Sequence, residues 1–465
     1  MNIFGRSRGP AVLALTLGSA LGCAASTRST RAELLRIEPT LAPLSELEGE
    51  RARPAPAFDG SLGPYLAYAF ANSPALRARF EAWRAATHRP AQERRMPEPT
   101  ISYAAFVRAV ETRVGPQRHR LSASQWFPWP TKLSAGSDAA ELEAHAAQRR
   151  FESFTLEIAA AVAEAYWLLW RIERELEVHQ GEIEVLQSLS EQVRGRVAVG
   201  VAELSDLAQI DLQLSRARDR HASLERQKRA ASAGLVRVVG APVDTPTPVG
   251  SGEPSADPPA DSVDVLTASA AAHPDIGTFA SLSDAARQRE RKARAERAPS
   301  FGLGVDWVLT GDSVASPAPS GSGKDAVAVS LSLRVPLWTR VYRAAQSEAR
   351  AEAAVHRSRA IDARNAVFAE VRQHAELLED ASRRVAFYDN TLIPQGTTAF
   401  ESVLASYATG RSTVAELLLA ERALISLRTE RFIALADYGT ELARLERAVG
   451  RPVGVGPADH RKETP

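Results

Sequence analysis

The second half of this 465-residue chain repeats the landmarks of its first half in the same order. Each matched segment carries a proline or a glycine in an equivalent setting, and partners lie 200, 208 or 210 residues apart. The five pairs are Pro74 with Pro274, Pro99 with Pro299, Pro128 with Pro336, Gly200 with Gly410, and Pro242 with Pro452. Such an ordered set indicates an internal duplication. We expect a first repeat over residues 61–243 and a second repeat over residues 263–453.

Each repeat is expected to begin with helix and to continue with two strands. Apolar spacing typical of helices covers residues 62–95 and 262–297. Val327, Val329 and Leu331 alternate with small or polar residues, and this period of two is typical of a strand. The predicted strands are residues 99–108 and 118–127 in the first repeat, and residues 299–309 and 326–335 in the second. Pro128 and Pro336 then mark the strand-to-helix junctions.

Very long helices should follow the strands. Two lines of residues spaced by seven predict a coiled-coil seam. The first line is Ile158, Ala165, Ile172, His179, Leu186 and Val193, and the second is Val162, Leu169, Leu176, Ile183 and Val197. Gly200 and Gly410 permit bends, so helical hairpins are expected over residues 132–240 and 340–449. Ser205 in the first repeat and Ser412-Thr413 in the second are predicted to cap the returning helices. Pro394 is predicted to kink or split the second long helix.

The segments outside the repeats have their own patterns. Residues 1–22 carry positive residues and then a short apolar stretch, which is typical of a secretory signal peptide. Cys23, the only cysteine, follows in a sequence that resembles a bacterial lipobox, so we predict lipidation there; an ordinary signal peptide with an incidental cysteine is the alternative. The remaining predictions are a lipidated tether and wrapping segment over residues 23–60, a Pro/Gly/Ser-rich linker over residues 244–262, and a disordered tail over residues 454–465.

Composition and motifs exclude several classes of function. The 57 Lys+Arg and 56 Asp+Glu leave a net charge of +1, which gives no strong field for gathering nucleic acid. A single cysteine excludes a disulfide framework and a four-cysteine zinc site. The histidines are scattered, no carboxylate–histidine cluster has metal-ligand spacing, and no hydrolase or kinase motif appears. We therefore expect no enzyme activity, no cofactor, no metal site and no nucleic-acid partner.

With these features the chain resembles the TolC family of bacterial outer-membrane efflux channels. The resemblance rests on the duplicated plan, the segments near Pro74 and Pro274, the strand end Phe-Pro-Trp-Pro before residue 131, and the bend over residues 407–412. It implies a mainly α fold with a β-barrel part. Three identical chains would each contribute four strands to one twelve-stranded outer-membrane barrel, and their long helices to one coiled-coil tunnel in the periplasm. The strand end over residues 125–133 is similar to that of members accompanying heavy-metal pumps of the resistance–nodulation–division class.

The resemblance also implies a gate at the helical bends. In TolC-like channels a tyrosine and an arginine of the second repeat bond an acid of the first, and acids at the constriction set cation preference. These roles fall on Tyr407, Arg411 and Asp206, with Glu416 as the aperture acid; Arg411 stands one place before the arginine of the family pattern. The alternative for the two acids is stabilisation of the first turn of a helix through its dipole. For the tyrosine and the arginine the alternative is ordinary surface or seam packing.

Two functions fit the sequence. The first is an outer-membrane channel of a tripartite efflux system, which passively conducts substrates from periplasm to exterior. It would contact outer-membrane lipid and dock with a periplasmic adaptor (membrane fusion protein) and an inner-membrane pump of the resistance–nodulation–division class. The second is a lipid-anchored periplasmic coiled-coil scaffold without a pore, in which the strands form soluble hairpins. Alternating strands at matching positions of both repeats favour the channel. Whether the substrate is a metal ion, a drug or another small molecule stays open.

Overall fold

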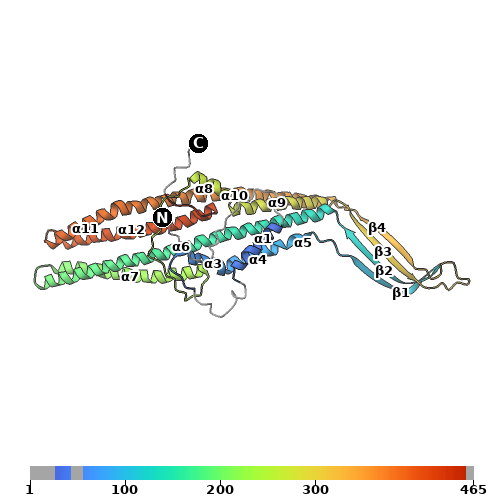
Figure 1. Ribbon diagram of the computed structural model, residues 1–465, viewed down its shortest axis with the longest axis horizontal. Coiled ribbons are helices and arrows are strands. Elements are labelled where there is room, and N and C mark those ends of the chain that lie inside the picture. The colour runs from blue at the N-terminus through green and yellow to red at the C-terminus, as the bar shows by residue number, and fades with distance from the viewer. Residues whose placement is uncertain (1–26, 43–55, 457–465) are drawn as a thin grey trace, which may run out of the picture.

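The computed structural model describes residues 27–42 and 56–456. The molecule is elongated, with a sheet at one end and the bends of two long helical hairpins at the other (Figure 1). The predicted signal peptide, the predicted lipidation site Cys23 and most of the predicted tail lie outside the described residues. The molecule therefore separates a strand-built end from a helix-built end, and the sites of interest lie at both.

The two repeats share one order of elements, which supports the duplication seen in the sequence. Before them lie α1 (Thr27–Ile37) and the 3-10 turn η1 (Glu38–Thr40). The first repeat contains α3 (Leu62–Asn72), α4 (Pro74–Thr87), α5 (Arg89–Glu93), β1 (Thr100–Thr112), β2 (Gly115–Phe127), α6 (Pro130–Ala198) and α7 (Leu204–Val239). The second contains α8 (Val263–Ala270), α9 (Pro274–Ala295), β3 (Ser300–Thr310), β4 (Ala326–Arg334), α10 (Thr339–Phe387), the π-helical turn η2 (Tyr388–Leu392), α11 (Ile393–Ala408) and α12 (Val414–Val449).

The strands form one antiparallel sheet in the order β1-β2-β3-β4. The first hairpin is longer than predicted, since its strands reach Thr112 and Gly115 and leave a turn of two residues between them. Gly115 has a φ of 133°, and a side chain there would collide with the carbonyl oxygen of Gly311 at 1.8 Å. Only glycine fits this tight turn, which the β3–β4 loop touches. The sequence pattern did not reveal this contact, so the predicted loop between the first two strands, residues 109–117, was longer than the observed turn.

The long helices carry the predicted coiled-coil seam. The helix α6 has 69 residues, which at 1.5 Å per residue is roughly 100 Å. Most members of the two heptad lines are buried, and Leu169, Leu186 and Val193 are fully buried. The predicted seam is confirmed: α6 packs against α7 and α12 along it.

Pro394 interrupts the second long helix as predicted. The helix α10 ends at Phe387, a π-helical turn follows, and α11 begins with Pro394 as its second residue. Because proline has no backbone N–H and its ring crowds the preceding turn, regular α-helical hydrogen bonding cannot continue through it. The wider π turn over residues 388–392 accommodates this mismatch between the two helices.

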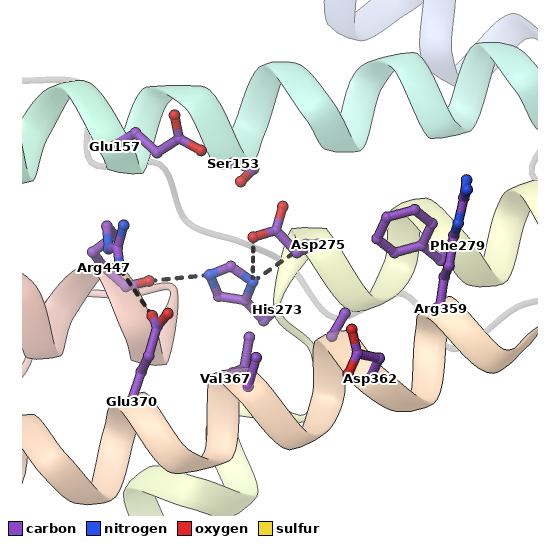
Figure 2. Close-up of a pocket in the computed structure, with 12 residues that line it drawn as sticks. Ser153, Glu157, His273, Asp275, Phe279, Arg359, Asp362, Val367, Glu370 and Arg447 are labelled. Carbon is purple, nitrogen blue, oxygen red and sulfur yellow. Dashed lines mark hydrogen bonds and ion pairs between the residues drawn. The ribbon is translucent and has the colours of Figure 1, made fainter. Parts of the chain in front are cut away.

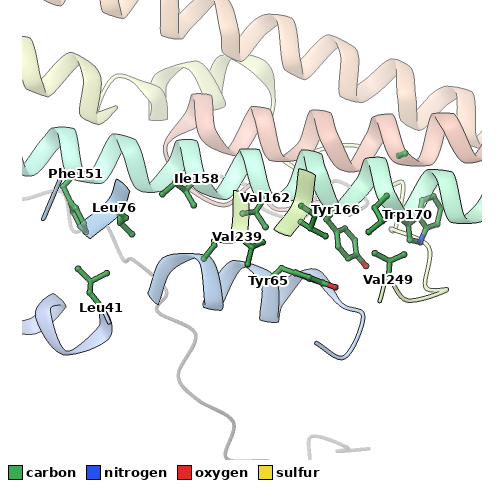
Figure 3. Close-up of a cluster of buried hydrophobic side chains, with 14 of the residues drawn as sticks. Leu41, Tyr65, Leu76, Phe151, Ile158, Val162, Tyr166, Trp170, Val239 and Val249 are labelled. Atoms are coloured by element: carbon green, nitrogen blue, oxygen red, sulfur yellow. The ribbon is translucent and has the colours of Figure 1, made fainter. Parts of the chain in front are cut away.

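The main core lies where the first repeat, the N-terminal helix and the connection between repeats meet (Figure 3). Tyr65 of α3, Tyr166 of α6 and Val249 of the connection all belong to this core. The Tyr65 hydroxyl donates to the Pro248 carbonyl oxygen at 2.7 Å. The connection over residues 244–262 thus packs as an ordered strap, because tyrosine hydroxyls satisfy carbonyl groups that no strand or helix partner reaches.

Candidate gate and membrane sheet

Both hairpin bends have the same backbone structure. Gly200 and Gly410 adopt φ of 73° and 72°, in the left-handed region. The residue after each glycine closes a six-residue turn: Val201 N–H donates to Arg196 O, and Arg411 N–H to Ser406 O, each at 2.9 Å. This is the Schellman arrangement that ends helices. Nothing would contact a side chain at either glycine, so the positive φ alone accounts for the residue.

The helices that leave the two bends begin differently. Thr413 caps α12 as predicted, and Glu416 completes a capping box: the Glu416 carboxylate accepts from Thr413 N–H at 2.8 Å, and the Thr413 hydroxyl accepts from Glu416 N–H at 3.2 Å. The prediction that Ser205 caps α7 is wrong. The N-terminal flanking residue is Glu203, because the helix begins at Leu204, two residues earlier than a cap at Ser205 would require. The Ser205 hydroxyl instead donates to the Glu203 carboxylate at 3.0 Å.

The two predicted gate residues of the second repeat face different neighbours. The Tyr407 ring is half-buried beneath the guanidinium of Arg196, whose central carbon lies 5.6 Å from the ring centroid. Arg411 is exposed, and its Nε donates to the Thr409 hydroxyl at 3.0 Å. Sequence reasoning missed Arg196. No motif marks it, since the equivalent position of the second repeat is Ser406.

Asp206 lies half-buried in the first turn of α7. Within the described part of one chain, neither Tyr407 nor Arg411 bonds its carboxylate. At this position a carboxylate interacts favourably with the positive end of the helix dipole, which is the alternative stated above. Glu416 is exposed and also serves its own helix, through the capping box. Both acids remain near the bends, where a contact from another chain could reach them.

A small apolar cluster joins the two bends. Leu186 and Val193 of α6 pack with Ile210 of α7 and with Val414 and Leu418 of α12. Tyr407 packs against the same cluster. A displacement of one hairpin tip would therefore expose apolar surface shared with the other, which couples the two bends mechanically.

A buried carboxylate lies next to this cluster in the seam between α12 and α6. Glu421 is 5% exposed, and neither of its carboxylate oxygens has a hydrogen-bond partner in the described part of the chain. The pKa of Glu421 is raised to about 7, mainly by burial and also by the nearby Glu182 carboxylate, while Arg422 lowers it. Glu182 itself is held by His179 Nδ1 at 2.6 Å. The sequence did not single out this group, because the predicted heptad lines cover residues 158–197 and do not extend to α12.

The sheet has one apolar face and one polar face. Phe301, Leu303, Val305 and Trp307 of β3 lie opposite apolar residues of β4 in register. The same face of the four strands carries exposed apolar side chains, with Leu331 74% exposed. The exposed members are Ile101, Tyr103, Leu121, Phe127, Phe301, Leu303, Val305, Trp307, Val327, Val329, Leu331 and Leu333. So large an exposed apolar surface suits contact with lipid or protein and not with water.

Polar and small residues cover the other face. Arg120 and Ser122 of β2 both bond the Asp306 carboxylate of β3, at 2.6 Å each for the closest atoms. Arg334 of β4 lies over the Trp126 ring, with 4.4 Å from its central carbon to the centroid. The alternation predicted from period two is therefore present in three dimensions. Pro128 and Pro336 stand between strand and helix, after Phe127 and before Thr339 respectively.

A cavity of about 410 Å³ lies between α6, α9, α10 and α12 (Figure 2). His273 in its wall accepts from Asp275 N–H at Nδ1 at 3.2 Å, and its Nε2 lies 3.1 Å from the Arg447 carbonyl oxygen. Since both ring nitrogens are occupied by backbone groups, His273 acts as a helix cap and not as a general base. Ser73 has the same capping role in the first repeat, where its hydroxyl accepts from Leu76 N–H at 3.3 Å.

None of the described helices combines the length and apolarity needed to cross a membrane. Within residues 27–42 and 56–456, no group of three or more histidine, cysteine, aspartate and glutamate side chains could hold a metal ion.

Comparison with known proteins gives a family and a fold. The family model described as outer membrane efflux protein matches residues 66–241 and 265–451. No curated protein sequence matches the chain. Three solved structures are similar to the chain. A membrane protein from Pseudomonas aeruginosa has a TM-score of 0.70 and 18% identity, covering 87% of this chain and 99% of that one. The outer membrane protein VceC from Vibrio cholerae has a TM-score of 0.69 and 18% identity, covering 84% of this chain and 96% of that one, and the CmeC outer membrane channel from Campylobacter jejuni has a TM-score of 0.65 and 14% identity, covering 87% and 90% respectively.

The two matched ranges coincide with the two repeats and break at the connection between them. At these identities the solved structures establish the fold: long helices with four strands per chain, as predicted from the resemblance to TolC. The family consists of channels, which agrees with the expectation that the chain is not an enzyme. The chain belongs to the outer membrane efflux protein family, the family of TolC-like channels.

Proposed function

We propose that three copies of this chain form one outer-membrane channel that passively conducts substrates from periplasm to exterior. The observation that carries this proposal is the sheet: one face is apolar and exposed across all four strands, and β1 and β4 have no strand partner on their outer sides within the described chain. In hydrocarbon, unpaired backbone groups at a sheet edge are costly. Pairing β4 of one copy with β1 of the next removes both edges and yields twelve strands from three copies.

The helical end would form the periplasmic tunnel with its gate at the hairpin bends. Both bends lie at the end opposite the sheet, so they would face the inner membrane. We assign the entrance to Tyr407, Arg411, Asp206 and Glu416, with bonds to Asp206 made in the closed assembly. Three copies of Glu416 around a narrow axis would repel one another and attract cations. A periplasmic adaptor and an inner-membrane pump of the resistance–nodulation–division class would dock at this end and open it.

Cys23 and the substrate belong to the same proposal. Lipidation of Cys23 after removal of residues 1–22 would add an acyl anchor to the sheet, since buried acyl chains bind membranes by roughly 0.8 kcal/mol per CH₂.

The strand end over residues 125–133 supports the subtype that accompanies heavy-metal pumps. In that case the metal ion is cargo, and the chain conducts it without a resident metal site.

The first experiment measures the mass of the particle extracted from outer membranes in mild detergent, followed by conductance in planar bilayers. A particle of three chains that forms conducting pores supports the proposal. A monomer that needs no detergent would instead support the lipid-anchored scaffold, and it would make the strands a soluble pair of hairpins. Trimers that never conduct, even with gate variants, would also overturn the channel.

A further inference from the structure

A row of alternating charges crosses the helices next to the sheet. Arg89 Nη1 on α5 lies 3.7 Å from Glu143 Oε2 on α6. Glu143 Oε1 pairs with Arg289 on α9, and Arg289 Nη1 lies 3.3 Å from Glu352 Oε2 on α10. We call these four residues the charge belt. It begins with a cation on α5 and ends with an anion on α10, so each internal member has an opposite charge on both sides.

The charge belt follows the internal duplication. Arg289 lies 200 residues after Arg89, the offset that separates Pro99 from Pro299. Glu352 lies 209 residues after Glu143, the offset between the first residues of α6 and α10. The pair Arg89–Glu143 inside the first repeat therefore corresponds to Arg289–Glu352 inside the second. The contact between repeats, Glu143–Arg289, has no equivalent within one chain.

The order of helices and strands indicates where the counterpart of the Glu143–Arg289 contact would lie. The helix α5 leads into β1, α6 follows β2, α9 leads into β3 and α10 follows β4. Packing between α5 and α6, α6 and α9, and α9 and α10 gives the helices the same order as the strands. The two edges of the sheet are thus continued by α5 and α10. At these edges the side chains of Arg89 and Glu352 are 60% and 45% exposed.

We propose that Glu352 of one copy pairs with Arg89 of the next copy, so that the charge belt closes into a continuous ring of alternating charges around the helical wall. This inference rests on the proposed channel, and its partner is a second copy of this chain. Pairing β4 with β1 of a neighbour brings α10 of the first copy next to α5 of the second. Opposite charges then meet at one level, as they do between the repeats.

The belt would set register more than it would add stability. Exposed ion pairs contribute little net free energy, because solvent and salt screen them. Complementary charges nevertheless disfavour wrong pairings, in which like charges would face each other. A copy displaced along the wall, or packed head to head, would place Arg89 next to another cation or away from Glu352. The belt thus distinguishes the ring-closing arrangement from other edge contacts.

Cross-linking tests the contact directly. In a Cys23→Ser background, which removes the only thiol, the double variant Arg89→Cys/Glu352→Cys is treated with a short bismaleimide and run on a denaturing gel. We expect covalently linked dimers and trimers from the double variant and none from either single variant, since each single site meets no second thiol. The matched control is Glu143→Cys/Arg289→Cys, the equivalent pair inside one chain, which should consume both thiols without linking copies.

The particle mass is measured before the reagent is added, so that two failures can be told apart. A three-chain particle that links through residues 89 and 352 supports the inference. A three-chain particle that does not link, while the control pair reacts, overturns the belt and leaves the channel proposal standing. A monomeric particle overturns the channel and the belt with it.

If the cysteine pair prevents assembly, Arg89→Lys keeps the charge and allows a carbodiimide to form an amide with a carboxylate. Links between copies that disappear on adding Glu352→Gln support the inference, and links that persist overturn it.

Discussion

The guanidinium of Arg196, near the end of α6, lies over the ring of Tyr407, near the end of α11, with 5.6 Å from its central carbon to the centroid. This contact joins the first helical hairpin to the second directly beside both bends. An outward movement of either tip would separate the two side chains. In the proposed channel, this contact would therefore hold the closed arrangement of the entrance in each chain.

Removing this contact should favour the open entrance. A cation–π contact contributes about 0.5–2 kcal/mol, so Arg196→Gln should raise the ratio of open to closed channels roughly two- to thirtyfold. Single-channel recording in planar bilayers measures that ratio. The control is Arg194→Gln, which removes a nearby exposed guanidinium that lies 3.7 Å from Asp211. Equal open ratios in the Arg196 variant and the parent protein would show that the contact does not hold the entrance.

Glu416 caps α12, and in the proposed channel it would also contribute charge at the entrance. Glu416→Gln keeps an acceptor for Thr413 N–H and removes the charge, so cation preference should fall with little loss of stability. Glu416→Ala should also lose about 0.5–2 kcal/mol of helix stability. Reversal potentials in a salt gradient report the first effect, and thermal unfolding reports the second. An unchanged reversal potential in the glutamine variant would leave Glu416 as a cap only.

Glu421 should make stability depend on pH. Its folded-state pKa of about 7 lies above the ordinary 4.5, so its stabilising contribution is complete below about pH 4.5 and is lost as the pH rises through about 7. Glu421→Gln should therefore gain stability on the order of 1–3 kcal/mol at pH 8 relative to the parent protein, and little at pH 4.5. Thermal unfolding followed by circular dichroism at both pH values measures this.

The control for that experiment is Glu401→Gln, which neutralises an exposed carboxylate on α11. This control substitution should change the stability by the same amount at both pH values, or leave it unchanged at both. If Glu421→Gln and the control keep the same pH dependence as the parent protein, the Glu421 carboxylate does not titrate between these values, and water or a neighbouring chain must solvate it.

The two faces of the sheet should respond oppositely to charge. Leu331→Lys places an ammonium on the apolar face and should cost about 2–4 kcal/mol if that face meets lipid at mid-depth. Ser330→Lys, one residue away on the polar face, should be tolerated. The measurement is the yield of trimer in the outer membrane. Equal yields for the two variants would contradict a lipid-facing apolar side.

The predicted lipid anchor can be tested independently of the fold. Cys23→Ala should abolish incorporation of labelled fatty acid, because no other cysteine is available for the linkage. The parent protein grown in parallel provides the positive control. Labelling that persists in the variant would show that the lipobox prediction is wrong.

Local rules explain what could be read from the sequence. Strand alternation, as in Val327 to Leu333, follows from side chains pointing to opposite faces at every second residue. The bends at Gly200 and Gly410 follow from a left-handed φ that glycine adopts without strain. The Pro394 interruption follows from a missing N–H. Even the charge belt carries a sequence signal, since its members recur at the offsets of the repeat, although this spacing alone predicts no contact between them.

The sequence by itself determined the duplication, the kind and order of elements and the positions of the bends, because each depends on residues close in the chain or on strict periodicity. Only the tertiary structure decided which side chains meet across helices. Arg196 meets Tyr407 and Glu143 meets Arg289, whereas Glu421 has no hydrogen-bond partner among the described residues. Such contacts depend on how helices of about 100 Å are rotated and offset against each other, and no local rule specifies that rotation. The ordered strap over residues 244–262 belongs to the same group. Its Pro/Gly/Ser composition predicted a linker, and buried tyrosines from distant helices decided that it packs.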